Sequence, residues 1–344
     1  HWKGHSDTET LLGCMSCWGV EQTLQHIEGM FAFAVWDRQQ QALYLARDRM
    51  GEKPLYYGWQ GDSFLFGSEL KALKAHPSFN SAVDRGVLGL FFRYNYVPGP
   101  YSIYEGIRKL LPGSFLKLDL ANHAARDCPE PIAYWSLARV AEQGIGNRFS
   151  GSEAQALDLL EEKLSAAVSD QMLSDVPLGF LLSGGIDSSL VCALAQKVSS
   201  QPIRTFSVGF DDKAYDESAY AKEIAAHLGC NHTELVVSPD DALDLVNKLP
   251  TIYDEPFADS SQLPTYMVMN LVKQHVTVAL SGDGGDELFG GYNRYHHAPN
   301  LWRWLSRLPG PTRGLAAASL TALPADLVNR FSGILGVAQL GDKA

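Results

Sequence analysis

Hydrophobic residues in the first 135 positions fall into short runs that tight polar turns separate. Runs of this length, rich in aromatic and β-branched residues, predict β-strands, and the turns between them predict hairpins. A few segments have apolar residues at helical spacing, over 8–17, 19–27, 69–75 and 87–96. Many strands with few helices predict a layer of antiparallel sheet. The predicted strands cover residues 30–36, 41–47, 55–59, 64–67 and 115–120.

From Ser152 onward the pattern changes to strands that alternate with longer helices. Residues 154–171 are apolar at positions i, i+3 and i+4, which predicts an amphipathic helix. Alternation of strand and helix predicts a parallel sheet with helices on both faces, and such sheets bind ligands at the carboxyl ends of their strands. The predicted strands cover 178–182, 203–208, 234–237 and 276–280, and the further helices cover 190–198, 217–228, 240–249 and 263–273.

We therefore predict an α/β protein with two domains, for which 344 residues suffice. An α+β antiparallel sandwich over 1–135 precedes a parallel-sheet α/β domain over 153–344. Residues 136–152 carry three glycines and several polar residues, which favours a linker between the two.

The charge balance limits the partners of this chain. Its net charge is −11 and no basic cluster is present, which argues against nucleic-acid binding. No apolar run reaches the roughly 18 residues of a membrane span. Five cysteines are an odd, sparse set that fits a reducing compartment, so we expect a cytoplasmic protein. Cys14 and Cys17 form a C-x-x-C pair without a second pair downstream, which disfavours a zinc or redox site.

The most informative stretch is a glycine-rich loop, S-G-G-I-D-S-S over residues 183–189, between a predicted strand and a predicted helix. Unpaired backbone N–H groups and the positive end of a helix dipole favour an anion such as phosphate there. Asp187 would repel phosphate unless a divalent cation lay between them, so the loop predicts a nucleotide phosphate with Mg2+. The loop lacks the lysine of a P-loop and the G-x-G-x-x-G of dinucleotide sites. It resembles the pyrophosphate loop of the ATP pyrophosphatases, and an ordinary small-residue turn is the alternative.

A second loop, S-G-D-G-G-D-E over residues 281–287, follows the last predicted strand. If both strands belong to one parallel sheet, the two loops lie at the same edge of it. Asp187 and Asp286 could then share one Mg2+ and hold a pyrophosphate between them. A solvated acidic turn is the alternative for this loop.

The two loops together resemble those of the glutamine-hydrolysing asparagine synthetases. Three upstream segments, 29–34, 47–57 and 67–73, resemble the second half of that family's glutaminase domain. The resemblance implies a domain of the N-terminal-nucleophile amidotransferase type, which releases ammonia from glutamine, followed by an ATP-pyrophosphatase domain that activates a carboxylate as acyl-AMP. Ammonia then displaces AMP. With aspartate as the acceptor, the implied products are asparagine, AMP, pyrophosphate and glutamate, and the implied cofactors are ATP and Mg2+.

The resemblance also implies roles for individual residues. Asp187 and Asp286 match magnesium-linked aspartates. Asp283 matches a catalytic position that matters for forming the acyl-adenylate, where the best-known members carry glutamate. Asp7 matches the aspartate that binds the amino group of glutamine, although Ser6-Asp7-Thr8-Glu9 also reads as a helix N-cap. The expected ATP and pyrophosphate ligands are Leu181, Ser183, Gly184, Gly185, Asp187, Ser188, Ser189, Val208, Ser281 and Gly282.

The chain departs from the family pattern at its beginning. The family's nucleophile is an N-terminal cysteine whose α-amino group serves as the base, whereas this chain begins with His1. Cysteines inside the chain cannot replace that residue. We therefore expect an internal piece of a longer protein, which lacks both the N-terminal nucleophile and the C-terminal end, and which does not hydrolyse glutamine alone.

The acceptor remains open at this point. Asp254, Glu255 and Asp259 lie between the two loops in the sequence and are expected to bind the acceptor, with an acidic surface turn as the alternative. Their segment resembles the version in bacterial amidotransferases of surface-polysaccharide loci, so a sugar uronate is an alternative to aspartate. A non-catalytic nucleotide-binding protein is the third possibility. The remaining expectation is small-molecule partners only, with a homodimer as one possible assembly.

Overall fold

The computed structural model describes residues 4, 6–119, 128–210, 218–237 and 239–321. Contacts divide the chain into two units. The first unit comprises His1–Gly185 with Ser189–Ser281, and the second comprises Ile186–Ser188 with Gly282–Ala344. Each unit is described by itself.

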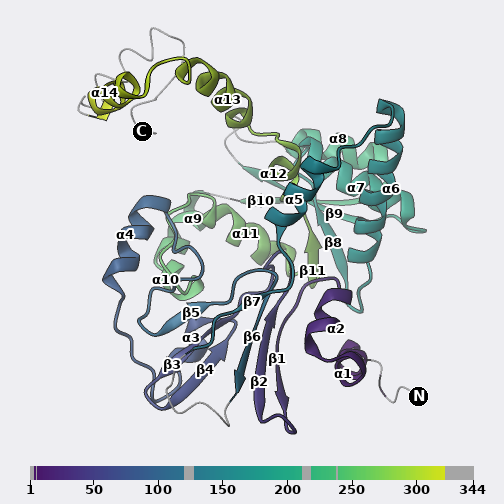
Figure 1. The fold of residues 1–344 in the computed structure, drawn as a ribbon. Coiled ribbons are helices and arrows are strands. Elements are labelled where there is room, and N and C mark those ends of the chain that lie inside the picture. Colours follow the sequence, from purple (N-terminus) through teal and green to yellow (C-terminus); the bar gives the residue numbers. More distant parts are fainter. Residues whose placement is uncertain (1–3, 5, 120–127, 211–217, 238, 322–344) are drawn as a thin grey trace. The chain divides into compact units, whose positions relative to one another are not determined.

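The first unit contains two antiparallel sheets, as the short hydrophobic runs predict (Figure 1). The larger sheet has the strand order β1-β2-β6-β7 and the smaller one the order β4-β3-β5. Helices α1, α2, α3 and α4 accompany them. Their bounds are α1 Asp7–Trp18, α2 Val20–His26, β1 Ala32–Asp37, β2 Ala42–Arg47, β3 Tyr56–Gln60, β4 Ser63–Gly67, α3 Leu70–Lys74, α4 Arg85–Tyr94, β5 Ile107–Lys109, β6 Ser114–Asp119 and β7 Ile132–Ala133.

Side-chain alternation along β2 explains why the sheets stack. Ala42, Tyr44 and Ala46 pack in one cluster with Leu24 of α2. Leu45, on the opposite face of β2, packs with residues of the other sheet and of β6. Side chains alternate in the same way along strand β3. Tyr57 faces the larger sheet, while Tyr56 packs against the cluster that contains residues of α3 and α4. The result is a helix–sheet–sheet–helix stack, which confirms the predicted α+β sandwich.

The same unit also contains the parallel sheet, in the order β10-β9-β8-β11. Phe180 packs with α6, α7 and α8 on one face, whereas Phe206 and Val208 belong to clusters with α9 and α11 on the other. The predicted parallel sheet with helices on both faces is therefore confirmed. The bounds are α6 Glu153–Gln171, β8 Leu178–Leu181, α7 Ile186–Val198, β9 Arg204–Phe210, α8 Ser218–Leu228, β10 Asn231–Val237, α9 Pro239–Val246, α10 Leu249–Ile252, α11 Gln262–Val272 and β11 Val278–Leu280.

The order of the strands locates a switch point. The chain builds β9 and β10 outward on one side of β8, and then returns to place β11 on the other side. Successive crossovers therefore run in opposite directions from the line between β8 and β11. In open parallel sheets, ligands bind at such a position, beyond the carboxyl ends of the strands.

Some predicted boundaries differ from the structure. Helix α7 begins at Ile186, whereas the sequence pattern predicted a start at residue 190, because Gly185 caps the helix and brings Asp187 into the first turn. The predicted linker over 136–152 contains a helix, α5 Leu137–Gly146, with no buried side chain. The extent of the two domains stays a prediction. The sequence pattern also did not predict α10 Leu249–Ile252, α12 Gly285–Phe289, α13 Asn293–Leu305 or α14 Gly310–Thr321.

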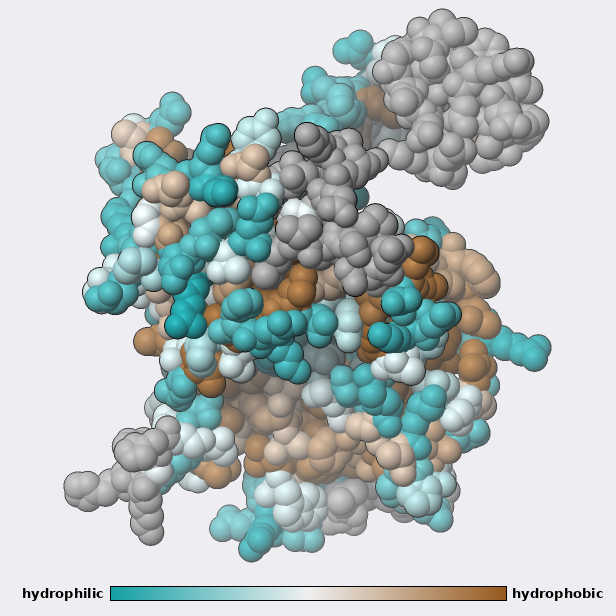
Figure 2. All heavy atoms as spheres, turned by 180° about the vertical axis from the view of Figure 1, so that it is seen from behind, coloured by the Kyte–Doolittle hydropathy of each residue, from teal (hydrophilic) through white to brown (hydrophobic). Residues whose placement is uncertain are grey.

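Hydrophilic residues are distributed over the face in Figure 2, with brown hydrophobic areas between them. Large apolar side chains such as Phe92 and Leu173 remain exposed, as is common on folded chains. Among the described residues, no helix combines the length and the apolar character needed to cross a membrane.

The interface between the two antiparallel sheets yields a stability prediction. Leu45 is fully buried there, so Leu45→Ala should lower the free energy of unfolding by about 2–5 kcal/mol. Leu157 on α6 is 60% exposed, and Leu157→Ala should change it by less than about 0.5 kcal/mol. Urea unfolding of both variants measures the difference. Equal losses would contradict the stacked-sheet interface.

Candidate functional site

The two glycine-rich loops leave adjacent strands at one edge of the parallel sheet. Strands β8 and β11 pair in parallel, with Leu178 opposite Val278 and Phe180 opposite Leu280. Ser183 and Ser281 therefore follow neighbouring strands at the carboxyl edge, on either side of the switch point. This confirms that the two loops share one sheet edge. Their roles as ligands stay a prediction.

The first loop turns directly into α7. Gly184 has a φ of +83°, a conformation that side chains with a Cβ adopt rarely. Gly185 is the N-cap and has no side chain to cap the helix, and its N–H donates to the hydroxyl oxygen of Ser183 at 3.4 Å. The hydroxyl of Ser189 donates to the carbonyl of Gly185 at 2.6 Å. The N-terminus of α7 therefore presents the positive end of its dipole, which is suited to an anion.

Residues of the second loop lie directly against the first turn of α7. A Cβ on Gly282 would lie 2.6 Å from the backbone N of Ser188. A Cβ on Gly285 would overlap with the carboxylate of Asp187. Gly284, between them, has a φ of +93°. All of these residues belong to the second unit, and only glycine allows backbone to approach this closely.

The carboxylates of the second unit can be tested as a cation site. Asp187 lies against Gly285, and the carboxylate of Asp286 is turned toward Gly291. Within the described part of the chain, no group of three or more histidine, cysteine, aspartate or glutamate side chains is placed to hold a metal. Mg2+ commonly takes one or two carboxylates and completes its shell with water and substrate phosphates. Two carboxylates such as Asp187 and Asp286 match that requirement in number and chemistry, and their role as magnesium ligands stays a prediction.

Two apolar residues predicted to contact ATP lie on the strands beside the first loop. Leu181 ends β8 and packs with Phe206, while Val208 of β9 packs with Leu245 and Met267. Both are half-buried. They belong to the helix-covered face of the sheet that α9 and α11 occupy.

Asp7 lies at the start of α1, remote in sequence from the loops. The N-cap is Ser6, whose hydroxyl oxygen accepts from the N–H of Thr8 at 3.2 Å. The exposed Asp7 carboxylate accepts from the hydroxyls of Ser6 and Thr8, at 3.3 and 3.4 Å. Capping therefore does not require Asp7, which leaves its predicted glutamine role as a proposal.

The structure separates the three residues expected to bind the acceptor. Asp254 accepts from the N–H of Leu70 at 2.6 Å, and Glu255 accepts from the N–H of Ile103 at 2.8 Å. Both carboxylates are thus engaged by the antiparallel sandwich. Asp259 instead accepts from the N–H of Ser261 at 2.8 Å, a bond that lowers the pKa of its exposed carboxyl.

Sequence reasoning did not identify the partners of Asp254 and Glu255. Lys71 lies 3.5 Å from Asp254 and Lys109 lies 2.5 Å from Glu255. The hydroxyl of Tyr56 donates to Glu255 at 3.5 Å. No periodicity or local motif connects these residues, because about 150 to 200 positions separate the partners.

A further polar cluster follows the second loop. Tyr292 donates to Glu287 at 2.7 Å, which lowers the pKa of the Glu287 carboxyl. The guanidinium of Arg294 lies 4.3 Å from the centre of the Tyr292 ring. Tyr292 directly follows Gly290 and Gly291, shortly after the second loop in the sequence, and this is the signal by which the cluster could have been found.

Comparisons with known proteins match both parts of the chain. A family model described as asparagine synthase matches residues 159–343, and one described as glutamine amidotransferase domain matches residues 1–129. A putative asparagine synthetase [glutamine-hydrolyzing] 2 from Methanocaldococcus jannaschii is 35% identical over 83% of this chain and 54% of its own length. Asparagine synthetase [glutamine-hydrolyzing] 1 from Bacillus subtilis is 33% identical over 93% of this chain and 48% of its own length. The chain therefore spans about half the length of these relatives.

The contact at Gly282 yields a binding prediction. Gly282→Ala places a methyl group against the backbone of α7, which should cost about 1–3 kcal/mol through overpacking. Binding of ATP with Mg2+, measured by calorimetry, should weaken at least about tenfold, which corresponds to 1.4 kcal/mol. Gly89→Ala is the matched control, since nothing lies within 4 Å of a Cβ at that position. Parent-like binding by Gly282→Ala would show that the packing of the loops is irrelevant to nucleotide binding.

Proposed function

The chain belongs to the asparagine synthase family, and on that premise we propose that it is part of an ATP-dependent carbon–nitrogen ligase that takes its nitrogen from glutamine. One observation carries the proposal more than any other. Two glycine-rich loops follow the paired strands β8 and β11 at the switch point of a parallel sheet, where a nucleotide is expected to bind.

The proposed reaction has two steps. A carboxylate oxygen of aspartate attacks the α phosphorus of ATP, and pyrophosphate leaves to give β-aspartyl-AMP. Ammonia from glutamine then attacks the acyl carbon, and AMP leaves as asparagine forms. Splitting the reaction in this way replaces a poor leaving group on the carboxylate with a good one.

The residues of the first loop serve the pyrophosphate in this proposal. Backbone N–H groups at the start of α7 face the leaving phosphates, with Ser183 and Ser188 as hydroxyl donors. Asp187 and Asp286 would hold the Mg2+ that neutralises the phosphate charge. Asp283, between Gly282 and Gly284, would act beside the acyl-adenylate. Leu181, Val208, Ser281 and Gly282 would contact the nucleotide.

The glutamine half of the proposal rests on the sandwich. Its match to the glutamine amidotransferase domain supports ammonia supply from glutamine, and Asp7 would bind the amino group of that substrate.

Pyrophosphate exchange tests the reaction in the full-length protein. With ATP, Mg2+ and aspartate, we expect exchange of labelled pyrophosphate into ATP. Exchange that requires a sugar uronate and ignores aspartate would replace the acceptor and keep the chemistry. No exchange and no amide formation with ammonia and any carboxylate tried would contradict the ligase assignment and favour a non-catalytic nucleotide-binding protein.

Removal of one magnesium ligand provides a sharper test. Asp187→Asn should lower the exchange rate about 100-fold, because the loss of charge stabilisation by a bound metal is worth several kcal/mol. Asp158→Asn changes an exposed aspartate on α6 and should leave the rate unchanged. Rates at several Mg2+ concentrations, with the melting temperature as a check on folding, measure the effect. Equal rates for both variants would remove Asp187 from the metal site.

A further inference from the structure

The segment 253–262, here called the anchor segment, connects α10 to α11 and is tied to the antiparallel sandwich at three points. Asp254 accepts from the N–H of Leu70 at the start of α3. Glu255 accepts from the N–H of Ile103. The N–H of Ala258 donates to the carbonyl of Asn95, the residue that ends α4, at 2.8 Å.

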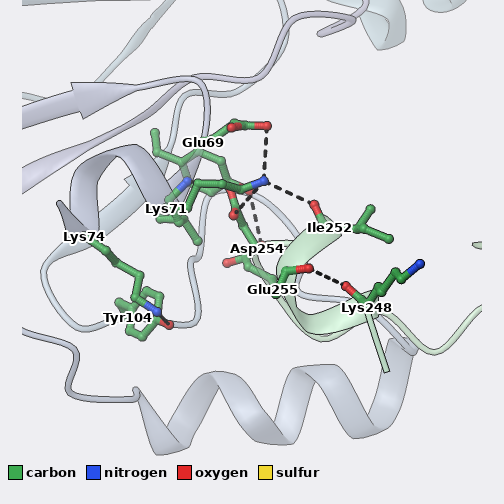
Figure 3. Close-up of polar contacts among 11 residues, drawn as sticks. Glu69, Lys71, Lys74, Tyr104, Lys248, Ile252, Asp254 and Glu255 are labelled. Carbon is green, nitrogen blue, oxygen red and sulfur yellow. Dashed lines mark hydrogen bonds and ion pairs between the residues drawn. The ribbon is translucent and has the colours of Figure 1, made fainter. Parts of the chain in front are cut away.

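Each carboxylate has a lysine partner from the sandwich. The ammonium group of Lys71 lies among the carboxylates of Asp254 and Glu69 and the carbonyl of Ile252 (Figure 3). The ammonium group of Lys109 lies 2.5 Å from Glu255 and also donates to the carbonyl of Val97 at 2.6 Å. Every oxygen of the two carboxylates therefore has a hydrogen-bond or ion-pair partner in the sandwich.

Burial makes these contacts costly to break. The side chains of Asp254 and Glu255 are only 13% and 10% exposed. Removing one partner of a buried ion pair leaves a charge without compensation. Burial, followed by the charges of Glu255 and Asp254, raises the pKa of the Tyr56 hydroxyl, so that it remains a protonated donor. The buried contacts of Asp254 and Glu255 with the sandwich, here called the joint, are thus preorganised. They differ in this from an exposed pair such as Lys197 and Glu161.

The anchor segment is also bonded within itself, at the start of α11. The hydroxyl of Tyr253 donates to the carbonyl of Gln262, and the side-chain amide of Gln262 donates to the carbonyl of Phe257. The segment therefore closes on itself and sets the start of α11. Helix α11 leads through a short connection to β11, whose end carries the second loop.

We propose that Asp254 and Glu255 are positioning residues that couple the glutaminase half to the synthetase half, and that they do not bind the acceptor. The proposal rests on the proposed function, because coupling has meaning only where ammonia passes from one reaction to the other. Of the three acidic residues in the anchor segment, Asp259 is the one whose carboxylate bonds within the segment, to the N–H of Ser261. Within the proposal, Asp259 is the one acidic residue of the segment that is kept as an acceptor ligand.

The test uses Lys109→Met in the full-length protein, because Lys109 belongs to the sandwich and lies in no proposed substrate site. We expect ammonia-dependent amide synthesis and its KM for the acid to remain within about twofold of the parent. With glutamine, the amount of amide formed per glutamate released should fall at least threefold. Glu255→Gln should lower the same ratio, and the double variant should be no worse than the more affected single variant. Lys197→Met, which breaks an ion pair on α7 outside the sandwich, should leave the ratio unchanged.

Two outcomes would overturn the proposal. The first is an unchanged ratio of amide to glutamate in both Lys109→Met and Glu255→Gln. The second is a KM for the acid that rises at least tenfold in Glu255→Gln and not in Lys109→Met, which would make Glu255 an acceptor ligand.

Hydrogen exchange separates failure of the joint from failure of the proposed function. In Asp254→Asn and Glu255→Gln, the amides of Leu70 and Ile103 should exchange at least tenfold faster than in the parent, whether or not any acid is amidated. Parent-like exchange at both amides would overturn the joint itself. A parent protein that forms no amide from ammonia would overturn the proposed function. Hydrogen exchange would then still test the contacts of the joint.

Discussion

The parallel pairing of β8 with β11 is the constraint on which the candidate site depends. Every other strand of the sheet lies on the far side of β8, so this pair alone brings the segment after residue 280 to the edge where the first loop ends. Hydrogen bonding fixes the register, and the register fixes which residues leave the sheet together. Glycine then completes the arrangement, because Gly282 and Gly285 allow backbone and carboxylate of α7 to come closer than any side chain would permit.

The joint at the anchor segment depends on a different interaction, the pairing of buried charges. Two carboxylates are removed from water and satisfied by backbone N–H groups and lysines of the sandwich. A buried pair is weak evidence for net stability, since desolvation offsets much of the attraction. It is nevertheless specific, because a small displacement leaves charges unpaired in the protein interior, which solvates them poorly. Such specificity is what the proposed coupling of the two halves requires.

The sandwich shows why the first part of the fold followed from hydrophobic patterning. A strand buried on both faces, such as β2, places alternate residues in two clusters, and each cluster packs against its own neighbouring layer. Short strands such as β5 and β7 escaped prediction because they span only three and two residues, too few for periodicity to register. Helix α5 escaped because its glycines favour a loop, and its side chains remain unburied.

The sequence by itself determined the two fold classes, most of their strands and the two loops suited to phosphate. These properties depend on residues that are near one another in the chain, where propensity and spacing act directly. The tertiary structure alone decided where α7 begins relative to Asp187, and that Gly282 touches Ser188. It also decided that Asp254 and Glu255 face the sandwich while Asp259 does not. A carboxylate has the same local pattern whether it meets a substrate or a distant lysine, so only folding distinguishes the two.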